Sequence, residues 1–201
     1  MKMRLSLVAL VAASLVGAAP LDDWQPDPGF RSLFNGRDLT GWCFRAKAER
    51  TSPKVGDVAE AFDGKLASSD DGRYSTSDGI LTVNFPKGKP SLISALYTVE
   101  EFPNDFTLKL EFRASPNADS GIFVRKPQLQ CRDYLVAGPY KDLKKYKPQD
   151  WNQVEVVVKG GMARCTCNGE VLEAEFKLPE TGPIGLEGDR GQMEYRHIQI
   201  K

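Results

Sequence analysis

Residues 105–113 alternate between polar and apolar side chains without a break. One face of this segment carries only apolar side chains, those of Phe106, Leu108, Leu110 and Phe112. A period of two is typical of an antiparallel strand with one buried face. We therefore predict a half-buried strand here, with Glu111 and Arg113 on its polar face.

Shorter apolar stretches follow along the chain. We predict strands at residues 121–125, 154–158, 162–167 and 170–172. Gly160-Gly161 and Asn168-Gly169 separate the last three of them, and such dipeptides are typical of tight hairpin turns. Strands joined in this way should pair antiparallel.

The region from 56 to 79 is rich in Asp, Ser and Gly and predicts long loops. Within it, residues 73–76 predict a short strand, and Val58–Phe62 predicts a helical turn. Many short strands without crossover helices favour an all-β sandwich or jelly roll of antiparallel strands. The polar face with Glu111 and Arg113 is then either a binding surface or the solvated face that such sheets commonly have.

The N-terminus has the three parts of a secretory signal peptide. The basic start MKMR precedes the apolar run LSLVALVAASLVG, and small residues follow at Ala18 and Ala19. This run is shorter than the roughly 20 residues of a membrane-spanning helix, although a retained anchor is the alternative. We expect residues 1–18 to be a signal peptide and residues 19–29 a leader. The mature protein would be periplasmic or extracellular, with no transmembrane segment.

The composition suits one domain with a neutral balance of charge. The chain has 201 residues, with 27 basic and 27 acidic side chains, so nothing indicates a nucleic-acid partner. Its four cysteines are Cys43, Cys131, Cys165 and Cys167. Export would permit disulfides, but the sequence does not choose among the pairings. We expect buried thiols or one disulfide rather than a zinc site, because the cysteine spacings do not suit zinc and there is one histidine.

Four segments together resemble the 3-keto-disaccharide hydrolase domain family. They are FRSLFNGRDLTGW from Phe30, ADSGIFVR from Ala118, DWN from Asp150 and GPIGL from Gly182. The resemblance covers residues 30–201, with matching order and spacing. It implies a concanavalin A-like jelly roll and a carbohydrate ligand, a glycoside whose sugar is already oxidised to a ketone at carbon 3.

The resemblance also implies a reaction. The ketone acidifies the proton on C2, a base removes this proton, the aglycone leaves by elimination and water then adds, so that the net result is hydrolysis. Ordinary glycosidases instead use two carboxylates around an oxocarbenium-like transition state. The implied chemistry needs one base and an electrophile for the enolate oxygen, either an arginine or a divalent cation. No cofactor is certain from the sequence.

Three carboxylates are candidates for the catalytic base: Glu111, Asp133 and Glu187. The resemblance implies a glutamate where this chain has Gln128. Since glutamine cannot act as a base, any catalytic role of that position would be lost or would pass to one of the three carboxylates. Glu111 could alternatively be a surface carboxylate paired with Lys109 or Arg113.

The candidate substrate-binding residues are Arg113, Arg125, Gln130, Arg132 and Asp189. Arg125 ends the ADSGIFVR segment, and a planar guanidinium suits sugar oxygens or an enolate, although it could equally form a salt bridge across the sheet.

The segment GDRG, residues 188–191, follows Glu187 directly. The carboxylates of Glu187 and Asp189 could share a pocket, where they would hold a divalent cation or raise the pKa of one of them. The alternative is an ordinary polar turn. We predict that Glu187 lies in one polar cleft with Glu111, Arg125 and Gln130.

The rival interpretation is a noncatalytic, lectin-like carbohydrate-binding module, because jelly rolls serve both purposes. A lectin would use exposed aromatic side chains, for which the candidates are Tyr134, Tyr140, Tyr146 and Trp151. A catalytic site would gather acids and arginines instead, and the sequence favours it slightly. His197 lies in the terminal strand and is expected to be structural.

Overall fold

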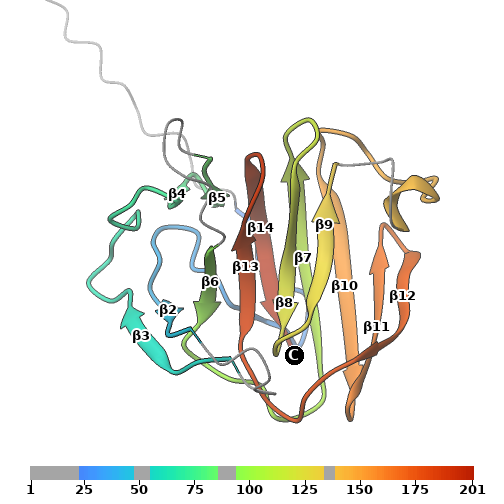
Figure 1. The fold of residues 1–201 in the computed structure, drawn as a ribbon, viewed down its shortest axis with the longest axis horizontal. Helices are drawn as coiled ribbons and strands as arrows, with labels where there is room; N and C mark the ends of the chain where they lie inside the picture. Colours follow the sequence, from blue (N-terminus) through green and yellow to red (C-terminus); the bar gives the residue numbers. More distant parts are fainter. Residues whose placement is uncertain (1–22, 48–54, 86–93, 134–138) are drawn as a thin grey trace, which may run out of the picture.

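The structure is a computed structural model that describes residues 23–47, 55–85, 94–133 and 139–201. The predicted signal peptide and Tyr134 lie outside these ranges. Within them, the only helix is a single 3-10 turn, η1 (Pro139–Lys141), and no helix is long and apolar enough to cross a bilayer. Strands make up about half of the described residues and are joined by turns and loops, so the predicted all-β class is confirmed (Figure 1).

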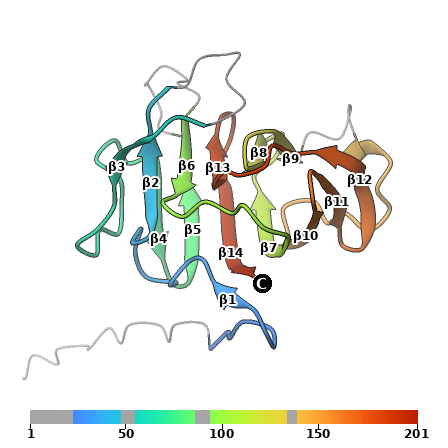
Figure 2. The same cartoon turned by 90° about the horizontal axis from the view of Figure 1, so that it is seen from below.

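Two antiparallel sheets stack face to face as a sandwich (Figures 1 and 2). The eight-stranded sheet contains β1 (Arg31–Ser32), β4 (Tyr74–Ser77), β5 (Ile80–Val83), β7 (Phe106–Ala114), β10 (Asn152–Lys159), β11 (Met162–Cys167), β12 (Glu170–Lys177) and β14 (Met193–Ile200). Its strand order is β12-β11-β10-β7-β14-β5-β4, with β1 paired to β14. The six-stranded sheet contains β2 (Trp42–Arg45), β3 (Val58–Ala61), β6 (Ser94–Thr98), β8 (Asp119–Val124), β9 (Gln128–Arg132) and β13 (Ile184–Gly188). Its strand order is β3-β2-β6-β13-β8-β9.

The inward faces of the two sheets form one apolar core. All four apolar side chains predicted for the buried face of β7 are buried there, and three of the four valines of β10, Val154, Val156 and Val158, lie beside them. Ile184 and Leu186 of β13 and Ile122 of β8 pack against them from the six-stranded sheet. The period-two pattern therefore identified the buried faces correctly.

Both predicted hairpins are present. Gly160, with φ +58°, begins the turn between β10 and β11, and Asn168 and Gly169 connect β11 to β12 with φ values of +48° and +81°. Two successive left-handed residues are what a type I′ hairpin turn requires. The predicted helical turn at Val58–Phe62 is wrong, because Val58–Ala61 forms the edge strand β3 and hydrogen-bonds to β2.

All four cysteines are free, buried thiols. Cys165 and Cys167 share the inward face of β11, and Cys131 enters the same core from β9. Burial raises the pKa of Cys165 and of Cys167 to about 12. These thiols therefore have little thiolate character at neutral pH.

Candidate functional site

Polar side chains on the outer face of the six-stranded sheet gather around Glu187. Leu186 belongs to the core, so the next residue of β13, Glu187, points away from it. The residue is nevertheless only 7% exposed. Strands β8 and β9 follow β13 in the sheet order and supply most of its neighbours.

Gln128 of β9 reaches Glu187 across the intervening strand β8. Its Nε2 donates a hydrogen bond to Oε2 of Glu187. The side chain crosses β8 at Gly121, where an added Cβ would lie 2.6 Å from both Cγ and Nε2 of Gln128. The absence of a side chain at residue 121 is therefore what allows this contact.

The next outward residues of β9 extend this contact into a chain of hydrogen bonds. Arg132 donates from Nη2 to Oε1 of Gln130, and Gln130 donates from Nε2 to Oε1 of Gln128 at 3.2 Å. Arg132 Nε also lies 3.0 Å from Oδ1 of Asp119, its cross-strand partner. Each carboxamide accepts from the cationic side and donates toward Glu187, so the chain connects a guanidinium to a carboxylate.

The surroundings of Glu187 favour its protonated form. Burial, followed by the nearby carboxylates of Asp189 and Asp119, raises its pKa to about 7. The hydrogen bond from Gln128 and the charge of Arg132 act in the opposite direction. A carboxyl group that titrates near pH 7 can both take up and release a proton under neutral conditions, as a general base must.

The GDRG turn is fastened to the start of β8. Asp119 N donates to Arg190 O at 2.8 Å, Arg190 N donates back to Asp119 O at 3.1 Å, and the two side chains form an ion pair at 3.5 Å. Gly191 has φ +81° and packs so closely that a Cβ would lie 2.7 Å from that of Ala118. The turn therefore belongs to the surroundings of Glu187. No group of three or more His, Cys, Asp or Glu side chains is arranged to hold a metal ion in the described ranges.

Two aromatic rings lie over β13 at Gly185, two residues before Glu187. Tyr97 of β6 and Phe123 of β8 are the cross-strand neighbours of Gly185, and their ring centroids are 5.7 Å apart. A Cβ at Gly185 would lie 2.5 Å from the Tyr97 ring. Burial and the charge of Glu187 raise the pKa of Tyr97 to about 12, so its phenol keeps its proton at neutral pH. Sequence reasoning missed Tyr97, because its partner strand β13 is distant in the chain.

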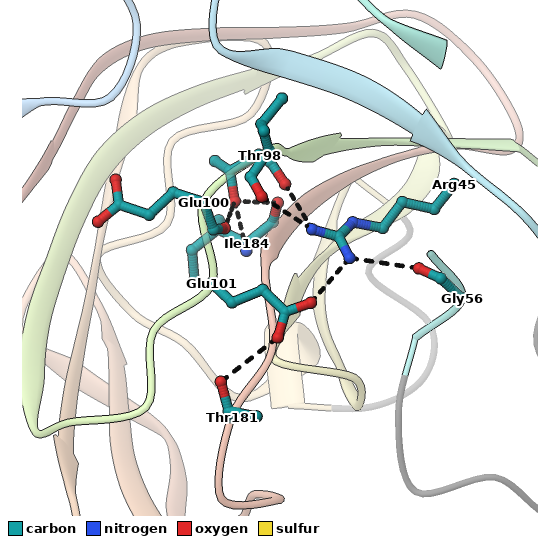
Figure 3. Close-up of polar contacts among 8 residues, drawn as sticks. Arg45, Gly56, Thr98, Glu100, Glu101, Thr181 and Ile184 are labelled. Carbon is teal, nitrogen blue, oxygen red and sulfur yellow. Dashed lines mark hydrogen bonds and ion pairs between the residues drawn. The ribbon is translucent and has the colours of Figure 1, made fainter. Parts of the chain in front are cut away.

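Arg45 lies on the same sheet but has a structural role. Figure 3 shows its guanidinium directed at Glu101 and at backbone oxygens. It donates to the carbonyls of Gly56, Thr98 and Val99 at 3.1–3.2 Å, and its Nη1 is 2.8 Å from Oε1 of Glu101. The side chain is only 3% exposed, so it connects β2 to the segment that follows β6.

Glu111 lies on the outer face of the opposite, eight-stranded sheet, so the predicted single cleft with Glu187 is wrong. Its Oε2 accepts a hydrogen bond from Arg196 Nε at 2.7 Å and lies 3.3 Å from His197 Nδ1. The hydrogen bond with His197 and the interaction with Arg196 lower the pKa of Glu111 to about 2. A carboxylate with so low a pKa is poorly suited to act as a base at neutral pH.

Arg113 shares the outer face of the eight-stranded sheet with Glu111. Its Nε lies 2.5 Å from Oε2 of Glu194, and its guanidinium stacks on Trp151 at 4.7 Å. The other face of the sandwich, with Glu187, lies beyond the core. Arg113 is therefore not brought together with the other predicted substrate-binding residues Gln130, Arg132 and Asp189.

Arg125 does not join Glu187 either, and the structure places it in the interior at the end of β8. It is 1% exposed, and its backbone N donates to Pro183 O, just before β13 begins. Its guanidinium donates to four backbone carbonyls, those of Phe102, Asn104, Gly160 and Pro179. The side chain connects loops, which corrects the expectation that it would clamp a sugar.

Asp133 is buried and holds the loops around it in place. Its carboxylate accepts hydrogen bonds from Tyr146 Oη at 2.9 Å, Gln149 Nε2 at 2.6 Å and Asn117 N at 3.3 Å. Tyr146 also packs near Tyr140, with ring centroids 5.4 Å apart. Both of these lectin candidates thus contribute to packing around Asp133.

The fold and the Glu187 face define a jelly-roll protein with a candidate acid–base site. The profile of the 3-keto-α-glucoside-1,2-lyase-like domain family matches residues 29–201, and the chain belongs to this family. This membership indicates a carbohydrate-related, hydrolase-like role. A search of curated proteins finds no match.

Solved structures with similar folds include three from two bacteria. A candidate glycosyl hydrolase from Parabacteroides distasonis has 16% identity and a TM-score of 0.61, over 86% of this chain and 93% of that one. A second one from the same organism has 20% identity and a TM-score of 0.53, over 67% and 92%. A glycosyl hydrolase family protein from Mycobacterium fortuitum has 12% identity and a TM-score of 0.52, over 85% and 100%. At these identities the likeness shows the fold alone.

Proposed function

We propose that the protein is an exported enzyme that cleaves glycosidic bonds of 3-keto-glycosides, with Glu187 as the general base. The observation that carries this proposal is a buried carboxyl group on the outer face of a sheet, beside two other carboxylates; its burial and these neighbours raise its pKa to about 7. Family membership supports the substrate class, and the apolar N-terminal segment with its basic start supports export.

In the proposed reaction, the Glu187 carboxylate takes the proton from C2 of the sugar. The electrons of the C–H bond form the C2–C3 double bond of an enolate, with negative charge on the oxygen at C3. Collapse of the enolate restores the ketone, forms a C1–C2 double bond and expels the oxygen at C1. The departing aglycone takes up a proton, and addition of water across C1–C2 yields the free 3-keto sugar.

The same face offers groups that would bind substrate and stabilise the enolate. Arg132 supplies a guanidinium that is held in place by its ion pair with Asp119. Gln130 and Asp189 would bind sugar hydroxyls. Carboxylate oxygens also suit a divalent cation, but the described side chains form no cluster of three ligands, so the proposed steps rely on Arg132.

The test is to incubate the mature protein with 3-keto-trehalose and with a 3-keto aryl glucoside and to measure release of the aglycone. Glu187→Gln should reduce turnover about 10²-fold or more, the usual contribution of a general base. Glu175→Gln, at an exposed position of β12, is the matched control. Full turnover in Glu187→Gln would contradict the assignment, and tight sugar binding without turnover in the wild type would favour the lectin-like alternative.

A further inference from the structure

A cavity of about 460 Å³ lies beside β1 and β14 of the eight-stranded sheet, whereas Glu187 lies on the six-stranded sheet. It is lined by residues 23–26, by Ser32 and residues 34–37, by Gly79 and by His197. Figure 2 shows β1 next to β14, its partner in the eight-stranded sheet, and away from β13. The volume falls within the range of small-molecule sites.

The sole histidine of the chain reaches this cavity because β14 contains a β-bulge. Tyr195 faces the core, and regular alternation would turn His197 inward as well. A register shift between Arg196 and Gln199 inserts one residue, so that Ile198 takes the inward position and His197 has φ +54°. Bulges and left-handed residues other than glycine are enriched at functional sites.

The imidazole of His197 is held from two directions. Its Nδ1 lies 3.3 Å from Glu111 Oε2, and Trp24 stacks on its ring with a centroid distance of 4.7 Å and an interplanar angle of 10°. Glu111 is itself held by Arg196. The orientation of this part of the cavity wall is therefore set before any ligand arrives, which reduces the entropy lost on binding.

The chemistry of the wall selects a class of ligand. Its formal charges are those of Asp23 and Arg37, which cancel, so the wall favours neither an anion nor a cation. Gln25 adds an amide with donor and acceptor groups, and Trp24 adds an aromatic surface. Sugar hydroxyls both donate and accept hydrogen bonds, and the C–H face of a pyranose is apolar. We propose that this cavity is a second, noncatalytic saccharide site.

This site would work without Glu187 and without a ketone on the sugar, so its test is independent of turnover. The mature protein is titrated with trehalose as a neutral probe and, separately, with acetate and inorganic phosphate. The chain has three tryptophans, and their indole N–H signals in nuclear magnetic resonance spectra are assigned from single Trp→Phe variants. Trehalose should shift the signals of Trp24 and His197 saturably, in the wild type and equally in Glu187→Gln.

Two variants test the wall itself. Trp24→Ala should weaken trehalose binding about tenfold or more, which corresponds to a loss of roughly 1.4 kcal/mol of binding free energy. The affinity of this variant is measured from the His197 signals. His197→Asn removes the imidazole but keeps a residue that tolerates left-handed backbone. It should weaken trehalose binding in titrations run well below the melting temperature of both proteins, which separates the lost binding from the stability lost with the Glu111 contact. Trp151→Phe, outside the cavity wall, is the matched control and should leave the affinity unchanged.

Several results would overturn the proposal. One is the absence of a saturable shift at Trp24 and His197 with trehalose. Another is a shift with acetate or phosphate that equals or exceeds that with trehalose. Unchanged affinity in Trp24→Ala, or loss of binding in Glu187→Gln, would place the saccharide elsewhere.

Discussion

Replacement of Glu187 by glutamine should stabilise the fold at neutral and alkaline pH while removing the proposed base. Glutamine has nearly the same shape, and its amide oxygen can still accept the hydrogen bond from Gln128. What disappears is a negative charge that the wild type must carry in a buried position beside Asp119 and Asp189.

The magnitude follows from the pKa of Glu187, which rises from 4.5 to about 7 on folding. A shift of about 2.5 units at about 1.4 kcal/mol per unit corresponds to about 3 kcal/mol. Because the folded protein binds this proton more tightly than the unfolded chain, stability is lost as pH rises through the window between these two values. The variant lacks this loss. The difference in free energy of unfolding between Glu187→Gln and the wild type should therefore be near zero at pH 4 and about 3 kcal/mol in favour of the variant at pH 8.

The assay is urea and thermal unfolding of both proteins at several pH values between 4 and 8. For a domain of this size, about 3 kcal/mol corresponds to a rise in melting temperature of roughly 6–12 °C. Glu175→Gln, at an exposed position of β12, is the control and should show no such pH-dependent gain.

Two outcomes would refute the reasoning. If Glu187→Gln is less stable than the wild type at pH 8, the carboxylate must have favourable partners that outweigh its burial. If the gain is the same at all pH values, it does not arise from ionisation of Glu187. A stabilised but inactive variant, by contrast, is the behaviour expected when a buried charge is retained for function at a cost in stability.

Three further predictions concern the rest of the molecule. Arg125→Lys should lower the free energy of unfolding by about 2–4 kcal/mol in urea titrations, because lysine cannot replace the guanidinium's bonds to four carbonyls; an unchanged midpoint would contradict this. Glu111→Gln should destabilise the fold at pH 7 but not near pH 2, since the lowered pKa of Glu111 contributes stability that is lost as pH falls from 4.5 toward 2; equal loss at both pH values would refute it. The four buried thiols should resist a thiol reagent until the protein is denatured, and fast labelling of the folded protein would show otherwise.

The strands could be predicted because their signal is local. The alternation of 105–113 and the glycine dipeptides specify a buried face and its turns within a few residues. The prediction for Val58–Ala61 was wrong because all four side chains of this edge strand are exposed. The sequence therefore has no alternation of apolar and polar residues there that would indicate a strand. Its conformation is set by backbone pairing with β2, which is a tertiary contact.

The candidate site was predicted only in part, for a related reason. Alternation correctly turned Glu111 outward, but a sandwich has two outer faces, and the sequence does not say which sheet each strand joins. The contact between Gln128 and Glu187 depends on a side chain that is absent at Gly121, on a third strand. Arg125 was misjudged because the loops that cover it come from distant parts of the chain.

The two outer faces give the same residue type opposite properties. Glu111 faces His197 and Arg196 and has a pKa of about 2, whereas Glu187 faces two carboxylates in a more buried position and has a pKa of about 7. At neutral pH Glu111 is therefore permanently charged, which suits it to orient a neighbouring side chain. Glu187 can take up and release a proton near neutral pH. Because the hydrophobic core lies between the two glutamates, a single small ligand could not contact both. In the proposed reaction, proton abstraction therefore belongs with Glu187, whereas Glu111 would orient the imidazole of His197 at the proposed saccharide cavity.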